Sequence, residues 1–390
     1  MLFVSDPHVA IDPIRTTGRV AQFRRSFVVA IAVVLALFVA ACGDASVPEP
    51  AAGAGGQSAP DAGEPAPAAS PEVLEAGEPS PTKLSDEADR GERAPEAPTA
   101  APTLVASVDP APVGRPPAPN ARSAPAVATT ALGLAEQIIA AETGLRDSAS
   151  TASQRADFGH LHQVAIRKLG YEPAWDTVIF EALPPELLEP TLLHVSARRA
   201  LIDLSSGYDA ADFIPAWAII EPESMDELLS HYQAAEAATG IEWEYLAAIN
   251  LIETGMGRIR GLSSAGAQGP MQFLPTTWAE AGIGEGDINA PADAIAGAAR
   301  YLVRRGGPSD MAGAIWGYNN SDNYVTAVQA YAELLRNDPA GLAAIYNWEI
   351  YFFTELGDIW LPTGFSTPES IDLDDYLAAN PWSAPDPGLR

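Results

Sequence analysis

The residues best suited to chemistry lie close together, beginning at Glu253. Glu253 ends an apolar stretch, IEWEYLAAINLIE, and the helical spacing places it on the same face as Leu246 and Ile249. This spacing predicts a helix that carries the acid on its buried side. Burial disfavours the charged form of a carboxylate, so it raises the pKa toward the range in which the group donates a proton at neutral pH. Glu253 is therefore a candidate general acid.

A glycine-rich loop follows the acid directly. Gly255 and Gly257 are expected to end the helix, and three more glycines follow up to Gly269. Glycine has no side chain to block a ligand, so the backbone of such a loop can approach a ligand closely. Met271 and Gln272 come next, an apolar side chain and an amide. An apolar wall with one amide suits a sugar, whose flat apolar faces are edged with hydroxyl and N-acetyl groups.

Three ordered motifs carry a family resemblance. The segment from 253 to 278, with ETG, SSAGAQGPMQ and LPTTW, resembles the core motif of lytic transglycosylases that have a goose-lysozyme-like domain. DAIAGAARYL at 293–302 and WGYNNSDNYVTAVQAYA at 316–332 agree with that family in order and spacing. The resemblance extends more loosely over 185–365. It implies an all-α, lysozyme-like fold.

The resemblance also implies roles for individual residues. Ser263 and Gln272 would hydrogen-bond the acetamido or hydroxyl groups of the substrate, and Met271 would line the sugar pocket. Tyr318 and Asn319 would reach Glu253 or the muramic acid unit from a facing helix. For Tyr318, the pattern of residues alone favours a packed core aromatic instead.

Two positions depart from the family pattern. Gly317 stands where alanine is common before Tyr-Asn, and Pro270 fills a place often held by leucine before Met-Gln. Proline stiffens the loop, and we expect it to leave the chemistry intact.

The motif supplies one carboxylate, whereas glycoside hydrolysis normally uses two. In the family, one acid protonates the glycosidic oxygen after N-acetylmuramic acid and then accepts a proton from that sugar's primary hydroxyl, which leaves a 1,6-anhydro end. Peptidoglycan glycan strands are thus the implied substrate, and no cofactor is needed. Two alternatives stay open: a muramidase that uses water, with Asp287 as the only loop acid worth testing, and a non-catalytic wall-binding lipoprotein.

Other site classes are disfavoured. The formal net charge of −29 argues against nucleic acid as a partner, because phosphate binding needs clustered Lys and Arg. His160 and His162 stand two apart without a third ligand at metal spacing, which favours a surface helix over a metal site. No metal is expected.

Two further patterns have simpler explanations. Asp287, Asn289 and Asp293 resemble half of a calcium loop, but the glycine and closing glutamate are missing, and capping of a following helix explains them. GLSSAG lacks the spacing of a nucleophile elbow, so Ser263 and Ser264 do not indicate a serine hydrolase.

The N-terminal part predicts export. Four arginines precede an apolar run from Phe27 to Ala41, which is short for a membrane span and ends in VAAC, similar to the lipobox of bacterial lipoproteins. Cys42, the only cysteine, would be lipidated and anchor the protein to the outer face of the cytoplasmic membrane. The alternative is an uncleaved signal anchor with a chance cysteine. Proteins of wall synthesis or division are conceivable partners that the sequence does not identify.

Composition predicts five segments. A signal peptide with lipobox occupies 1–42, and 43–130 is a Pro/Ala/Gly/Glu-rich linker that cannot bury enough apolar surface to order itself. A helical N-terminal subdomain is expected at 131–230, the lysozyme-like domain at 231–365, and a tail at 366–390. Helical spacing recurs through both subdomains, with a capping box beginning at Ser224. The aromatic segment IYNWEIYFFTELGDIWLPTG leaves open whether a short hairpin forms near the C-terminus.

Overall fold

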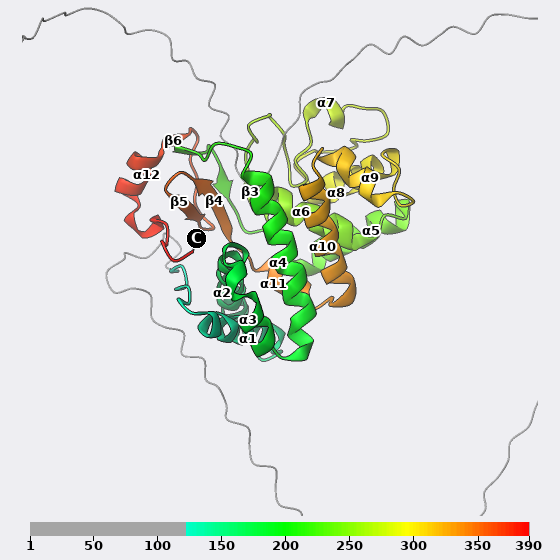
Figure 1. The fold of residues 1–390 in the computed structure, drawn as a ribbon. Coiled ribbons are helices and arrows are strands. Elements are labelled where there is room, and N and C mark those ends of the chain that lie inside the picture. Colours follow the sequence, from blue (N-terminus) through cyan, green and yellow to red (C-terminus); the bar gives the residue numbers. More distant parts are fainter. Residues whose placement is uncertain (1–121, 390) are drawn as a thin grey trace, which may run out of the picture. The chain divides into compact units, whose positions relative to one another are not determined.

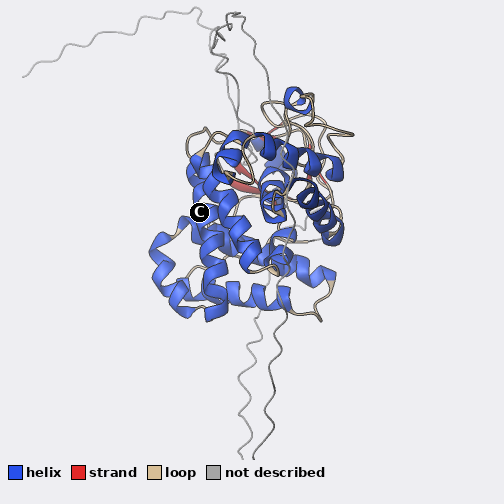
Figure 2. Ribbon diagram, turned by 90° about the vertical axis from the view of Figure 1, so that its right-hand side faces the viewer, coloured by secondary structure: helices blue, strands red, loops and turns tan. Residues whose placement is uncertain are grey.

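The computed structural model describes residues 122–389. They form a mostly helical body with a few short strands (Figure 1, Figure 2). The α-helices are α1 (Ala131–Arg146), α2 (Ala152–Tyr171), α3 (Asp176–Ala182), α4 (Pro185–Ser205), α5 (Met225–Thr239), α6 (Trp243–Thr254), α7 (Pro275–Trp278), α8 (Pro291–Arg304), α9 (Met311–Tyr318), α10 (Asp322–Asn337), α11 (Gly341–Tyr346) and α12 (Leu373–Ala379). Two 3₁₀ turns are η1 (Pro173–Trp175) and η2 (Pro381–Ser383). The expected all-α class is confirmed.

Helices α1 to α4 gather around one core at the N-terminal side (Figure 1). Thr130 caps α1 by accepting a hydrogen bond from the backbone N–H of Gly133, and Thr151 and Gln154 form a capping box at the start of α2. The apolar faces that meet here are supplied by Leu134, Ile138, Ile166, Leu169, Ile179 and Val195. This group of helices joins the rest of the body mainly through α4, which packs along α10, and also through α1 and α2, which contact α11.

The larger core surrounds α6. Helices α5, α8 and α10 all pack against it, and every residue from Leu246 to Thr254 is buried. A helix covered on all sides is apolar all round, which explains the continuous apolar run in its sequence. The helix before it, α5, has the predicted capping box of Ser224 and Glu227 and ends at Gly240 in the left-handed conformation.

Three two-stranded antiparallel sheets complete the body. The strands are β1 (Phe213–Ile214), β2 (Ala218–Ile219), β3 (Ile259–Arg260), β4 (Ile350–Thr354), β5 (Gly357–Leu361) and β6 (Ile371–Asp372). β4 and β5 form the hairpin that the sequence left open, with Ile350 opposite Leu361, while β1 pairs with β6. β2 pairs with β3, directly before the glycine-rich loop. We call this part, residues 211–221 and 350–377, the β-unit.

Several expectations concern residues that the structure does not describe. The signal peptide, Cys42 and residues 43–121 of the predicted linker all lie outside the described range. Residues 122–130 are described and run along α1, where Gln137 bonds to the backbone of Ala126 and Ala128. Among residues 122–389, none of the helices has the length and apolar character that crossing a membrane requires. The predicted domain boundaries stay predictions.

Candidate active site

Glu253 lies in the last turn of α6 with 2% of its surface exposed, as its helical spacing predicts. The helix ends there because Gly255 adopts a left-handed φ of 60° and donates its N–H to the carbonyl of Leu251. The acid therefore stands at the boundary between a buried helix and a glycine-rich loop.

Tyr324 is the residue that holds Glu253. Its hydroxyl donates to Oε1 of the acid at 2.6 Å, while Oε2 is buried and has no hydrogen-bond partner within residues 122–389. Burial raises the pKa of Glu253 to about 8, and the hydrogen bond from Tyr324 opposes that rise without cancelling it. The carboxyl is thus mostly protonated at neutral pH. Because Oε1 accepts from Tyr324, the proton belongs on Oε2, the oxygen that is free to donate it.

Two tyrosines surround the acid. Burial, and then the charge of Glu253, raise the pKa of both Tyr318 and Tyr324 well above the usual range, so both hydroxyls stay protonated and act as donors. Tyr318 donates to the carbonyl of Met271 at 2.6 Å. The adjacent Asn319 is 5% exposed, and its side-chain amide makes no hydrogen bond to any described residue. The electrostatic effect places Tyr318 near the acid, but Tyr324 makes the direct bond.

The loop after the acid is fastened to α6 at Pro270. The Pro270 carbonyl accepts from Asn250 Nδ2 at 2.8 Å and from Thr254 Oγ1 at 2.6 Å. Tyr232 in turn donates to Asn250 Oδ1 at 2.7 Å. Asn250 and Thr254 lie on the same helix as Glu253, before and after it, so the loop is fixed relative to the acid. Only the backbone carbonyl of residue 270 takes part in these bonds. Because proline lacks the backbone N–H but keeps the carbonyl, it can form the anchor as well as any other residue.

Gln272 lies in a tight turn at the end of the loop that follows Glu253. Gln268 and Phe273 exchange two backbone hydrogen bonds, and Gln272 lies between them with φ of 49°. Its Nε2 donates to the carbonyl of Gly269 at 2.9 Å. Gly269 is required there, because a Cβ would lie 1.9 Å from the carbonyl oxygen of Ile288.

The remaining predicted binding residues differ in exposure. Ser263 is partly exposed, and its Oγ accepts from the N–H of Ala267 at 2.9 Å, which leaves its hydroxyl hydrogen available to a ligand. Met271 has its side chain fully buried in the larger core. In the structure it is therefore the carbonyl of Met271, and not its side chain, that takes part in the site's polar contacts. The substrate-binding roles of these residues stay predictions.

Gly317, which departs from the family pattern, has a packing reason. Arg305 lies over it, and a Cβ on Gly317 would meet Arg305 Cδ at 2.9 Å. The same guanidinium stacks over the ring of Tyr301, 4.8 Å from its centroid, and Tyr301 donates to the Gly317 carbonyl. A glycine makes room for this arginine directly before Tyr318.

The surface-helix interpretation of His160 and His162 is wrong, because both side chains are buried. Helix α2 is covered by α1, α4 and α11. His160 bonds to the hydroxyl of Tyr351 in the hairpin at 2.8 Å. Residues on several faces of α2 are therefore interior, and a histidine pair two apart does not indicate a solvated face here.

His162 belongs to a buried cluster with Glu142 and His194, whose ligand-type atoms all lie within 4.8 Å of one another. Trp348 Nε1 donates to His162 Nδ1 at 3.2 Å, so a neutral ring carries its proton on Nε2, which lies 3.1 Å from Glu142 Oε1. A metal would need the lone pair of that Nε2. Arg146 donates to Glu142 Oε2 at 2.9 Å, so this carboxylate lies between a guanidinium and the His162 ring.

The acids of the segment that resembles half of a calcium loop bond to backbone N–H groups. Asp293 Oδ2 accepts from the N–H of Asp287 at 2.8 Å, and Asp287 Oδ1 accepts from that of Asn289 at 2.9 Å. These bonds organise the turn before α8. The predicted helix capping is wrong, because the N-cap residue of α8 is Ala290 and no side chain caps the helix.

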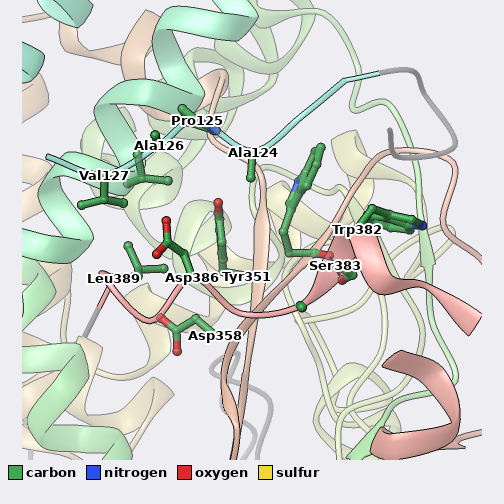
Figure 3. Close-up of a pocket in the computed structure, with 13 residues that line it drawn as sticks. Ala124, Pro125, Ala126, Val127, Tyr351, Asp358, Trp382, Ser383, Asp386 and Leu389 are labelled. Atoms are coloured by element: carbon green, nitrogen blue, oxygen red, sulfur yellow. Dashed lines mark hydrogen bonds between the residues drawn. The ribbon is translucent and has the colours of Figure 1, made fainter. Parts of the chain in front are cut away.

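A small cavity of about 30 Å³ lies between residues 124–127, the hairpin and the C-terminal segment (Figure 3). Tyr351, Asp358 and Trp382 are among its lining residues. It has room for about one water molecule. None of the groups that contact Glu253 lines it, so it is separate from the candidate active site.

Sequence reasoning missed Tyr324. The available signal was its place on α10, where it shares an apolar stripe with Val328 and Tyr331 in the helix that follows the Tyr-Asn motif. That pattern indicates burial, but the partner of the hydroxyl depends on how α10 crosses α6.

Residues 230–337 match the family model of the transglycosylase SLT domain. The matched range contains Glu253, the glycine-rich loop and Tyr324, and it supports a lytic transglycosylase catalytic domain that acts on peptidoglycan. No curated protein and no solved structure matches the chain. The helices α1 to α4 and the whole β-unit lie outside the matched range.

Proposed function

We propose that this protein cleaves the bond between N-acetylmuramic acid and N-acetylglucosamine in peptidoglycan and leaves a 1,6-anhydromuramic end. The observation that carries the proposal is a buried carboxyl with one oxygen held by Tyr324 and the other unpartnered. Among the described residues, burial and Tyr324 account for the shift of the Glu253 pKa, and no second carboxylate acts on it. A reaction that needs a single acid and base fits such a site.

The proposed reaction has two proton transfers through one carboxyl. Glu253 first gives its Oε2 proton to the glycosidic oxygen, the C1–O bond breaks, and the acetamido oxygen of the same sugar stabilises C1. The carboxylate then takes the proton of the C6 hydroxyl, and O6 forms the new bond to C1. The enzyme ends in its starting protonation state. A pKa near 8 suits a group that must both give and take a proton.

Surrounding groups have supporting roles in this proposal. Tyr324 orients the carboxyl and stabilises its charged form between the two transfers. Ser263, Gln272 and Asn319 are proposed to bond the acetamido and hydroxyl groups of the sugars, and Tyr318 holds the backbone of Met271 in place for them.

The nearest alternative is a muramidase, in which water replaces the C6 hydroxyl. That reaction needs a group to activate water, and Asp287 is the loop acid to test. Its Oδ1 already accepts two hydrogen bonds from Asn289, which favours a role in the turn. Reducing ends in the products, lost in Asp287→Asn, would support the alternative.

Location at the membrane is a proposal that rests on the sequence alone. We infer export, lipidation at Cys42 and attachment to the outer face of the cytoplasmic membrane, with the segment after Cys42 serving as a tether. Incorporation of a labelled fatty acid into the parent and its loss in Cys42→Ser would support this. Equal label in both proteins would contradict it.

The test of activity uses residues 42–390 with Cys42→Ser, called here the soluble chain. Purified peptidoglycan is digested with this protein, and the products are identified by mass spectrometry. Anhydro ends from the parent and none from Glu253→Gln support the proposal. An inactive parent that still binds glycan strands would instead support a non-catalytic wall-binding protein.

A further inference from the structure

We propose that Trp217 is a positioning residue of this active site, which holds the glycine-rich loop from the β-unit, outside the matched domain. The inference rests on the proposed function for its effect on substrate. Trp217 itself is 4% exposed, and its Nε1 donates to the carbonyl of Leu262 at 3.0 Å. Leu262 directly precedes Ser263, the partly exposed hydroxyl proposed to bind sugar.

The backbone of the glycine-rich loop packs closely against the indole ring of Trp217 at Gly261. A Cβ at Gly261 would lie 2.2 Å from Cδ1 of Trp217, so only glycine lets the backbone pass this near the ring. The side chain of Leu262 is 57% exposed, so it contributes little packing of its own. The contact with the ring therefore runs along the loop backbone.

Few other bonds hold this part of the loop. Within 261–267, the described backbone bonds run between Ser263 and its neighbours Gly266 and Ala267. Among the described residues, the Trp217 indole makes the one hydrogen bond that ties this stretch to a residue outside the loop. A loop with so few external bonds depends strongly on each one.

The β-unit in turn fixes the indole. The backbone N–H of Trp217 donates to the Pro215 carbonyl at 2.8 Å. The backbone carbonyl of Trp217 accepts from the backbone N–H of Thr367 at 3.0 Å. The ring stands edge-on to Phe352 of the hairpin, with centroids 5.4 Å apart. Next to it, Ala218 of β2 pairs with Arg260 of β3, so the strand that enters the loop is paired with the β-unit.

The two halves of the site thus have separate supports. Glu253 is held by Tyr324, and the Pro270 end of the loop is held by Asn250 and Thr254. Trp217 supports only the Ser263 end. Losing its N–H should therefore weaken binding of the substrate while the proton transfers continue once substrate is bound.

The test compares Trp217→Phe with Trp360→Phe in the soluble chain. The first change keeps an aromatic ring and removes the bond to the loop. The second removes an indole N–H of the same unit, which bonds to Glu349 at 3.4 Å and does not contact the loop. Two readouts are measured: backbone hydrogen exchange over 259–270, and KM and kcat on soluble glycan strands.

In Trp217→Phe we expect faster exchange across 261–267 and a KM raised about three- to tenfold, the usual effect of one lost hydrogen bond, with kcat within twofold of the parent. Trp360→Phe should change neither. Exchange equal to that of the parent, or a fall in kcat at unchanged KM, would overturn the proposal. If the parent lacks activity, the proposed function fails, and hydrogen exchange still decides whether Trp217 holds the loop.

Gly261→Ala provides a second route to the same contact should Trp217→Phe fold poorly. Its added methyl group pushes the loop away from the ring without altering the β-unit. The expected result is again faster exchange at 261–267 with a raised KM. Unchanged exchange and KM in this variant would overturn the proposal as well.

Discussion

The hydroxyl of Tyr324 donates to Oε1 of Glu253 across 2.6 Å and joins α10 to the last turn of α6. The two residues are 71 positions apart in the chain. This bond leaves Oε2 without a hydrogen-bond partner among the described residues, and it opposes the effect of burial on the pKa of the acid. The orientation of the acid therefore depends on one tyrosine, and its proton affinity depends first on burial and then on that tyrosine.

Removing that hydroxyl should slow the reaction and shift its pH dependence. In Tyr324→Phe, the charged form of Glu253 loses a hydrogen bond, so kcat should fall about 10- to 100-fold. The pKa of the acid should rise above about 8, because the group that lowered it is gone. The alkaline limb of the pH profile then moves to higher pH. Tyr331→Phe, two turns along α10, is the control and should retain the parent profile.

Replacing the acid should stabilise the protein at alkaline pH. The folded pKa of about 8 lies above the unfolded value of about 4.5, so the folded state keeps a proton that the unfolded state has released. The parent therefore loses stability as pH rises from 4.5 to 8. Glu253→Gln has no such loss, and its free energy of unfolding should exceed that of the parent by a few kcal/mol at pH 8, on the order expected from about 1.4 kcal/mol per pKa unit. Equal denaturation midpoints at pH 8 would contradict the buried, neutral carboxyl.

His194 should make the fold sensitive to acid. Burial, and then the neighbouring His162, lower the pKa of His194 well below its usual 6.5. Below that pH the unfolded chain binds a proton that the folded chain refuses, so stability falls as pH drops through about 6.5. His194→Leu should flatten this dependence in urea unfolding between pH 7 and 5. An acid slope as steep as that of the parent would show that the buried ring is not its source.

The Pro270 anchor should matter for both stability and substrate binding. Thr254→Val removes the hydroxyl that bonds the Pro270 carbonyl and nearly preserves shape. We expect a loss of about 1–3 kcal/mol in the free energy of unfolding, because a buried carbonyl loses a partner, together with a raised KM. Thr239→Val removes a hydroxyl that bonds to Ala235 and Ile241 and makes no bond to the loop, and it is the matched control. An equal loss of unfolding free energy in Thr254→Val and Thr239→Val would contradict the special role of the Pro270 anchor.

The helices that position the site could be predicted from the sequence wherever the spacing of apolar residues was clearly helical. The spacing around Glu253 predicted both a helix and a buried acid, because α6 has a continuous apolar surround. The capping box at Ser224 also formed as its residue types indicate. These features are local, so their residues determine them.

Features that depend on packing between distant segments were not predictable in the same way. The contact of Tyr324 with Glu253 and the hold of Trp217 on Leu262 both join segments dozens of residues apart. The buried histidines of α2 were misassigned because their burial depends on the helices and hairpin that cover α2. Residue type alone favoured the surface there, and tertiary contacts decided otherwise.

The most direct measurement is the chemical nature of the new glycan ends when the soluble chain digests purified peptidoglycan. Mass spectrometry should find 1,6-anhydromuramic ends with the parent, and no cleavage with Glu253→Gln. Reducing ends in place of anhydro ends, or the same cuts after the glutamate is replaced, would contradict a single buried acid as the agent of the reaction.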